Sequence, residues 1–109
     1  SEQCESALFQ LKQIPVAVGP ERKRVASILL VSDATAAQAT ENVTEQTIDT
    51  QQYQTMSSLP FAGEAIYLVD PLNNLIMAYP IPQGKSAQIT QSKGLLSDLR
   101  KLMRLSKVG

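Results

Sequence analysis

Two short apolar runs separated by turn residues constrain the fold of this chain more than any other feature. The first run covers residues 65–69, the second covers 75–79, and Asp70-Pro71-Leu72-Asn73-Asn74 lies between them. Uninterrupted apolar runs bounded by turn residues are typical of strands that are buried on both faces. A five-residue loop of this composition joins two such strands in an antiparallel hairpin. The sequence therefore predicts a buried β-hairpin in its C-terminal half.

A helix is predicted after this hairpin. Its apolar stripe consists of Leu95, Leu96, Leu99, Leu102 and Met103. This spacing places the stripe on one face of an amphipathic helix. Residues 80–91 are rich in Pro, Gly, Gln and Ser, so they are predicted to form an exposed connection that leads into the helix.

The N-terminal half begins with a second predicted helix. Its apolar face consists of Ala7, Leu8, Leu11, Ile14 and Val18. Gly19-Pro20 provides a stop signal, and Pro15 is expected to kink the last turn or to end the helix early. The β-branched, apolar run at 25–31 then predicts a central strand.

The middle of the chain gives weaker signals. Residues 33–42 are polar and rich in Ala and Thr, and they predict either a short helix or a surface loop. Residues 43–48 alternate weakly and predict an edge strand. Asp49 or Thr50 is a suitable N-cap for a short helix through residue 56, and a loop at 57–63 leads to the hairpin.

The predicted elements alternate between helix and strand, which indicates an α/β fold with a mostly parallel sheet. We expect 25–31 and 65–69 to run parallel at the centre of one mixed sheet, with the late hairpin adding an antiparallel pair. A closing helix completes the order of a thioredoxin-like fold whose first strand lies before Ser1. With 109 residues and a hydrophobic share of 43%, the chain has the size of a single domain, residues 1–109.

Composition excludes several classes of function. Ten basic and ten acidic residues give a formal net charge of zero, so no global field attracts nucleic acid. The chain has no histidine, which excludes histidine-based triads and zinc sites within it. It has one cysteine, Cys4, which cannot form an internal disulfide. No phosphate-binding glycine loop or nucleophile elbow supports a hydrolase or transferase.

A resemblance emerges when these features are taken together: Cys4, Gly19, Ile66-Tyr67-Leu68-Val69-Asp70-Pro71, Tyr79-Pro80 and the closing leucines. The chain resembles small, membrane-anchored, thioredoxin-like bacterial proteins that are related to the Sco/SenC copper chaperones. The resemblance implies a membrane anchor upstream of Ser1 and a domain on the periplasmic face of the bacterial inner membrane. It also implies an accessory function in cytochrome c oxidase assembly, with a membrane protein of that pathway as the partner.

The same resemblance suggests how Cys4 would act. Sco relatives handle copper with a Cys-x-x-x-Cys pair and a distant histidine. Here Cys4 would be the second thiol of a pair whose first cysteine lies just before Ser1, and Ala62 or Gly63 occupies the position of the histidine. Two thiolates suit Cu(I). The resemblance therefore implies Cu(I) or thiol handling in the longer protein, with no metal site within this chain.

Alternatives remain open at this stage. A thioredoxin-fold domain that only binds a partner protein needs no thiol at all, and a thiol-disulfide oxidoreductase needs a second cysteine. Without that cysteine, Cys4 is an ordinary thiol with no chemical function, and the residues of this chain favour a function other than enzyme catalysis. Tyr67 and Tyr79 are expected to pack as strand residues with satisfied hydroxyls. The basic residues of the last helix are expected to form a solvated face, namely Arg100, Lys101, Arg104 and Lys107.

Overall fold

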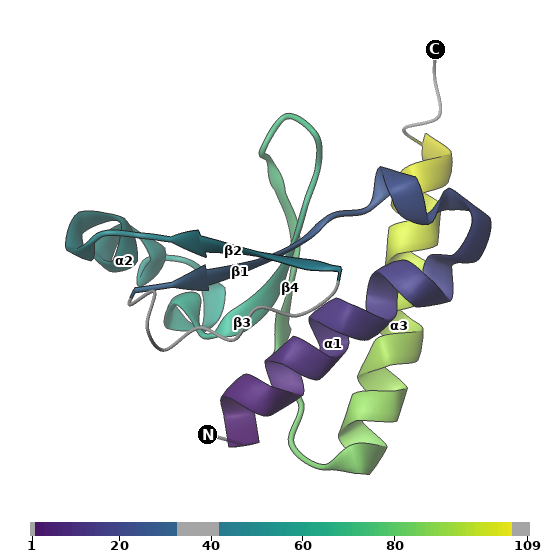
Figure 1. The fold of residues 1–109 in the computed structure, drawn as a ribbon, viewed down its shortest axis with the longest axis horizontal. Coiled ribbons are helices and arrows are strands. Elements are labelled where there is room, and N and C mark those ends of the chain that lie inside the picture. The colour runs from purple at the N-terminus through teal and green to yellow at the C-terminus, as the bar shows by residue number, and fades with distance from the viewer. Residues whose placement is uncertain (1, 33–41, 106–109) are drawn as a thin grey trace.

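The computed structural model describes residues 2–32 and 42–105 (Figure 1). In chain order the elements are α1 (Glu2–Val18), the 3-10 helix η1 (Gly19–Arg24), β1 (Ser27–Val31), β2 (Val43–Thr47), α2 (Thr50–Met56), the 3-10 helix η3 (Pro60–Gly63), β3 (Ala65–Val69), β4 (Leu75–Pro80) and α3 (Lys85–Leu105). The expectation of a helix or loop at 33–42 falls almost entirely outside the described residues.

The strands form two separate pairs rather than one sheet. β1 pairs with β2 in parallel, with Ser27 opposite Val43 and Val31 opposite Thr47. β3 pairs with β4 in antiparallel register, and the register shifts between Leu68 and Val69. The predicted hairpin is therefore confirmed. The predicted pairing of 25–31 with 65–69 in one mixed sheet is wrong, since β1 and β3 are not paired to each other in the described residues.

The hairpin turn follows directly from its sequence. The Asp70 carboxylate accepts hydrogen bonds from the backbone N–H groups of Leu72 and Asn74, at 2.9 and 2.8 Å. Asn73 adopts a left-handed conformation, with φ of 66°, which asparagine tolerates better than most residues. The hairpin loop extends away from the two long helices (Figure 1). Within the hairpin only Ile66 and Tyr79 are buried, so the prediction of strands buried on both faces is wrong.

The helix α1 continues through Pro15 to Val18, so of the two outcomes expected for Pro15, a kinked last turn or an early end, the early end is wrong. Proline has no N–H, and at position 15 it cannot donate to the carbonyl of Leu11, four residues earlier. The hydroxyl of Ser27, at the start of β1, donates to this carbonyl at 2.7 Å. A tertiary hydrogen bond thus replaces the helical one, and the carbonyl keeps a partner.

The core lies between α1, α3 and the base of the hairpin (Figure 1). Its buried members are Ile14, Val18, Ile66, Tyr79, Leu95, Leu99 and Met103. The predicted stripe of the closing helix is confirmed by three buried residues, Leu95, Leu99 and Met103. β1 contributes little, since Ile28 and Leu30 are 49% and 40% exposed. The prediction that this run is a central strand is therefore wrong for the described residues.

Two further predictions are settled by the local geometry of α2 and α3. Asp49 is the N-cap of α2, and with Gln52 it forms a capping box. By contrast, α3 begins at Lys85, so the exposed connection predicted over 80–91 is wrong for its second half. The first turns of α3 are polar, but they pack on α1: Gln10 Nε2 donates to the carbonyl of Gln88 at 3.1 Å.

Candidate functional site

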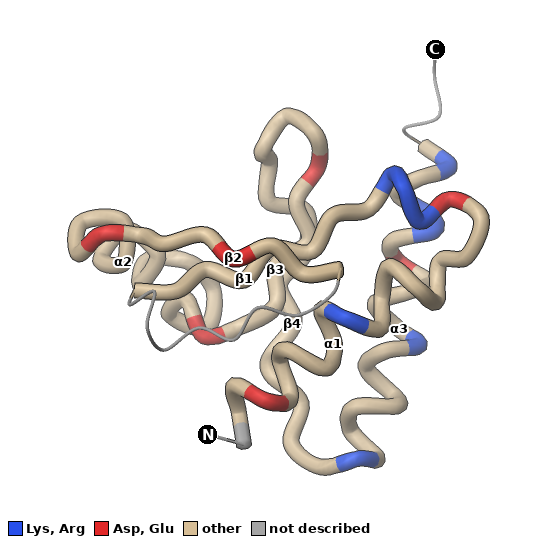
Figure 2. Tube along the Cα trace, in the orientation of Figure 1, with Lys and Arg blue, Asp and Glu red and all other residues tan. Residues whose placement is uncertain are grey.

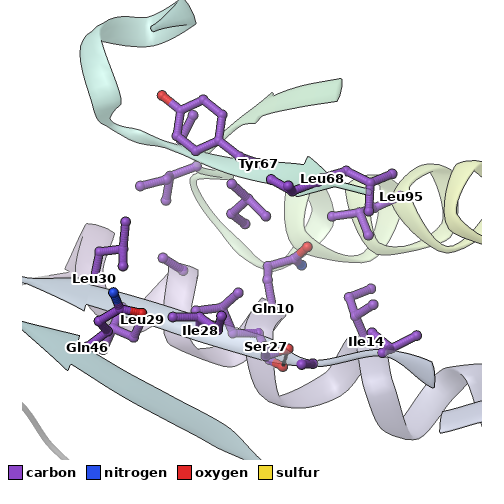
Figure 3. Close-up of a pocket in the computed structure, with 18 of the residues that line it drawn as sticks. Gln10, Ile14, Ser27, Ile28, Leu29, Leu30, Gln46, Tyr67, Leu68 and Leu95 are labelled. Carbon is purple, nitrogen blue, oxygen red and sulfur yellow. Dashed lines mark hydrogen bonds between the residues drawn. The ribbon is translucent and has the colours of Figure 1, made fainter. Parts of the chain in front are cut away.

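A cleft of about 630 Å³ separates the two sheets (Figure 3). Its walls are β1 on one side and β3 on the other, and the first turns of α1 lie at one end. The strands run in opposite directions across the cleft, Ser27 to Leu30 in one and Tyr67 to Leu68 in the other (Figure 3). The expectation that they run parallel is therefore also wrong. Among the described residues, β1 pairs with β2 alone and β3 pairs with β4 alone, which leaves the cleft between the two pairs.

The floor of the cleft is apolar apart from one side chain. Ile14, Leu95 and Leu99 line it, together with Gln10, whose side chain is fully buried at 0% exposure. Gln10 Nε2 donates to the carbonyl of Gln88 and to Ser92 Oγ, the latter at 2.7 Å. Its Oε1 is buried and has no hydrogen-bond partner among the described residues. A buried amide oxygen left in this state costs free energy.

Gln10 belongs to a polar seam between α1 and α3 that the sequence analysis missed. Ser6 Oγ donates to the carbonyl of Pro82 at 2.7 Å, and Gln88 Nε2 donates to Ser6 Oγ at 3.0 Å. The available signal was the spacing: Ser6 with Gln10, and Gln88 with Ser92, are polar pairs four residues apart on one helix face. Such pairs ordinarily face solvent, so only their packing against each other reveals the seam.

Cys4 lies at the mouth of this cleft. It is in the first turns of α1, its side chain is exposed, and it lines the cleft together with Gln3 and Ala7. An exposed thiol at a helix N-terminus is accessible to a partner molecule. The structure therefore places the one candidate site residue of the sequence in the lining of the cleft between the two sheets.

Gly63 and Cys4 line the same cleft. Gly63 is one of the two positions that the resemblance to Sco relatives led us to compare with their histidine, and its φ is +84°. A Cβ built there would lie 3.0 Å from the backbone oxygen of Met56. A residue with a side chain would therefore be strained at this position. Ala62, the other position considered, also has a positive φ, of 55°. The backbone of η3 thus disfavours a side chain at Gly63, whereas Ala62 already carries a Cβ in this conformation.

The two strand tyrosines serve packing, as predicted. Tyr79 is buried, its hydroxyl donates to Asp98 Oδ2 at 2.7 Å, and burial together with this carboxylate raises its pKa. Tyr67 is half-buried, its hydroxyl donates to the carbonyl of Pro60 at 2.6 Å, and burial raises its pKa as well. Both hydroxyls are therefore used within the fold.

Basic residues gather where η1 meets the C-terminal end of α3 (Figure 2). Arg24 donates to the carbonyl of Met103 at 3.1 Å and pairs with Glu21. Arg100 donates to the carbonyl of Ala17, also at 3.1 Å. Each guanidinium thus satisfies a carbonyl in the last turns of the neighbouring helix, where helices leave such groups unpaired. This packing accounts for both arginines; Lys107 lies outside the described residues.

Metal-ligating residues do not cluster in the described part of the chain. No group of three or more His, Cys, Asp or Glu residues lies close enough there to hold a metal ion. In the same residues, no helix is both long and apolar enough to cross a membrane.

The fold and the cleft describe a small α/β domain with a helix, a late hairpin and a closing helix, which is the thioredoxin-like class. A family model described as "Transmembrane-like, thioredoxin-like, C-terminal domain" matches residues 1–106. The chain belongs to this family of thioredoxin-like, membrane-associated proteins. The comparison with curated proteins found no match, and neither did the comparison with solved structures.

Proposed function

We propose that this chain is the accessory domain of a membrane-associated protein that handles Cu(I) or a thiol during biogenesis of cytochrome c oxidase. The observation that carries the proposal is the position of Cys4, exposed in the first turns of α1 at the mouth of the cleft. Membership in a thioredoxin-like, transmembrane-like family supports it. In this proposal the domain lies on the periplasmic face of the inner membrane, and its partner is a membrane protein of the oxidase assembly pathway.

Copper in this proposal is cargo, and the described residues supply only part of what it needs. Cys4 is one thiolate ligand, and no cluster of three candidate ligands surrounds it in the described residues. The second thiolate comes from a cysteine four residues upstream of Cys4, in the chain that leads into α1. Two thiolates form a soft ligand pair, which suits Cu(I). Each thiol releases its proton as the metal binds.

The test is oxidase activity in cells that carry Cys4→Ser in the full-length protein and grow under copper limitation. We expect activity to fall with Cys4→Ser and to stay at the wild-type level with Gln3→Ala. Gln3 is the matched control, because it is also exposed and lines the same part of the cleft but has no thiol. Wild-type activity with Cys4→Ser would remove the thiol from the mechanism.

A second candidate function is supported by a different observation. The hairpin exposes apolar side chains over much of its length, with Leu75, Ile76 and Met77 each at least 40% exposed. An apolar hairpin that projects from a domain is typical of a binding surface for another protein. If the domain only docks on a partner, Ile76→Lys abolishes its function in the same cells, whereas Cys4→Ser leaves it intact.

A further inference from the structure

The charges of this chain cancel as a whole but are separated in the structure. All ten Lys and Arg residues lie in residues 1–24 and 85–109, whereas residues 25–84 hold six of the ten Asp and Glu residues and no Lys or Arg. In the described part of the chain the basic residues therefore belong to α1, η1 and α3 (Figure 2). The helical side of the domain thus carries an excess of positive charge, and the side with the strands and α2 is negative.

The helical side also exposes apolar side chains along a groove between α1 and α3. The groove has a volume of about 260 Å³, and its lining includes Phe9, Gln13, Ala17, Ile89, Lys93 and Leu96, which we call the outer face. Phe9 is 45% exposed and Ile89 is 58% exposed, so both side chains reach solvent. Phe9 is five residues from the buried Ile14 and therefore lies on a different side of α1.

Cations border the outer face along α3. Lys93 is exposed and lines the groove. Arg100 lies at one end of the groove, because its guanidinium donates to the carbonyl of Ala17, which also lines it. Arg104 is exposed and follows Arg100 by one helical turn. The basic residues 22–24 of η1 lie beside the same end of α3 (Figure 2).

Acidic residues lie mostly away from this end of the outer face. Glu5 is one turn before Phe9, at the opposite end of the groove from Arg100. Glu21 pairs with Arg24 on η1. Asp98 accepts a hydrogen bond from the buried Tyr79 and so faces the hairpin. The outer face therefore combines exposed apolar side chains with a border of cations.

We propose that the outer face of α1 and α3 lies on the surface of an anionic lipid bilayer. Phe9 and Ile89 enter the boundary between the headgroups and the acyl chains, and Lys93 and Arg104 contact lipid phosphates. The negatively charged side of the domain, with its two strand pairs and α2, then points away from the bilayer. The proposal depends neither on the reactivity of Cys4 nor on oxidase assembly.

The chemistry of the outer face fits a lipid surface. Helices that lie in a membrane interface place bulky apolar residues on one side and Lys or Arg beside them, and they bind through both. Each Lys or Arg close to an anionic leaflet strengthens binding about fivefold. The separation of charge in this domain adds an orientation, because the side that lacks Lys and Arg is repelled by the same leaflet.

The family favours a bilayer over an acidic protein as the occupant. The chain belongs to a family described as transmembrane-like, and a domain tethered to a membrane meets the lipid surface at a high effective concentration. The cations of α3 extend from Lys85 to Arg104, which is about 30 Å at the rise of an α-helix. A row of cations of this length matches an extended layer of phosphates better than a single acidic segment.

Paramagnetic broadening of amide signals in the natural full-length protein tests the orientation. The ¹⁵N-labelled protein is placed in nanodiscs that contain a lipid with a gadolinium chelate on its headgroup. We expect the amides of Phe9 and Lys93 to broaden several-fold more in discs of phosphatidylcholine with phosphatidylglycerol than in discs of phosphatidylcholine alone. Any membrane anchor is the same in both discs, so only the lipid charge differs. Equal broadening in the two discs would overturn the proposal.

Two internal comparisons sharpen this measurement. The amide of Tyr53, on α2, should broaden little in either disc, and added salt should remove the difference at Lys93 because it screens the lipid charge. Broadening of Tyr53 as strong as that of Lys93 would overturn the orientation. A loss of oxidase function with Cys4→Ser, or its absence, would leave these readouts unchanged.

A matched pair of variants separates the outer face from the rest of α3. Ile89→Gln should lower the broadening at Lys93 several-fold in the anionic discs, whereas Leu105→Gln should leave it unchanged. Both residues are exposed, at 58% and 77%, and their separation of sixteen residues places them on nearly opposite sides of the helix. Equal effects of the two substitutions would show that the contact is not made by the outer face.

Photocrosslinking in native membranes identifies the occupant directly. A benzophenone amino acid replaces Gln13, which is exposed, lines the groove and carries no charge. We expect irradiation of the full-length protein to give lipid adducts, detected by mass spectrometry. Adducts with another protein in place of lipid would show that an acidic partner covers the outer face, and the proposal would be wrong.

Discussion

At the scale of single residues, a few buried side chains carry most of the packing. Leu99 is 6% exposed and lies midway between Leu95 and Met103 on the buried face of α3. Tyr79 joins the hairpin to the same helix, since its hydroxyl donates to Asp98. The long helix and the hairpin are therefore held to each other by individual residues whose removal has a defined consequence.

We expect Leu99→Ala to lower the free energy of unfolding by roughly 2–5 kcal/mol, because it removes buried methyl groups and leaves a cavity. Denaturant unfolding of the domain measures this loss. Leu105→Ala on the same helix is the control: Leu105 is 77% exposed, and its substitution should change stability by less than about 0.5 kcal/mol. A loss below about 1 kcal/mol for Leu99→Ala would mean that α3 does not pack on the core.

Tyr79 should make the free energy of unfolding depend on pH in the alkaline range. Burial raises the pKa of Tyr79 in the folded state, and the hydrogen bond to Asp98 and the charge of this carboxylate raise it further. Above about pH 10 the tyrosine of the unfolded chain loses its proton while the folded protein retains it, so the unfolded state binds fewer protons. The free energy of unfolding should therefore fall as the pH rises above this value.

Tyr79→Phe separates this effect from the titration of lysines and other tyrosines. Its free energy of unfolding should decline less steeply above about pH 10 than that of the wild type. Tyr53→Phe, at an exposed position on α2, should decline in parallel with the wild type. Parallel curves for wild type and Tyr79→Phe would contradict the assignment.

At the scale of elements, the junction of α1 with β1 shows how a helix accommodates an internal proline. Pro15 removes one helical donor, and Ser27 Oγ supplies a donor to the carbonyl of Leu11 instead. The helix thereby keeps its full length to Val18, and the start of β1 is held against it. One hydrogen bond thus joins the proline-containing turn of α1 to the start of β1.

A double-mutant cycle measures this dependence. Ser27→Ala should lower the free energy of unfolding by about 1 kcal/mol, because it leaves the Leu11 carbonyl without its hydrogen-bond donor. In a Pro15→Ala background residue 15 regains an N–H that can donate to Leu11, so Ser27→Ala should cost clearly less there. Equal costs in the two backgrounds, measured by denaturant unfolding, would show that Ser27 does not compensate for the proline.

At the scale of the whole molecule, the domain has one thiol, no histidine, and no cluster of three candidate ligands among the described residues. We therefore expect that residues 1–109 by themselves do not bind Cu(I) tightly. Anaerobic titration with Cu(I) against a competing chelator checks this expectation. Stoichiometric binding by the monomer that survives Cys4→Ser would reveal a copper site elsewhere in the chain.

The sequence by itself determined the elements whose causes are local. The turn at Asp70, the capping box at Asp49 and the leucine stripe of α3 each depend on residues within a few positions of one another. Local signals also selected Cys4 as the one candidate thiol and gave the thioredoxin-like class, which the family comparison supports. The part of the candidate site that could be predicted from the sequence is the part that depends on a single residue type, the thiol of Cys4.

Only the tertiary structure decided the features that join distant residues. The early start of α3 depends on contacts between Gln10 and Gln88, the continuation of α1 depends on Ser27, and the cleft depends on β1 and β3 failing to pair. None of these follows from periodicity, because hydrogen bonds between residues far apart in the chain leave no regular spacing in the sequence. The apolar runs at 25–31 and 65–69 predicted a shared sheet, since hydrophobicity indicates that a strand packs but not which strand lies beside it.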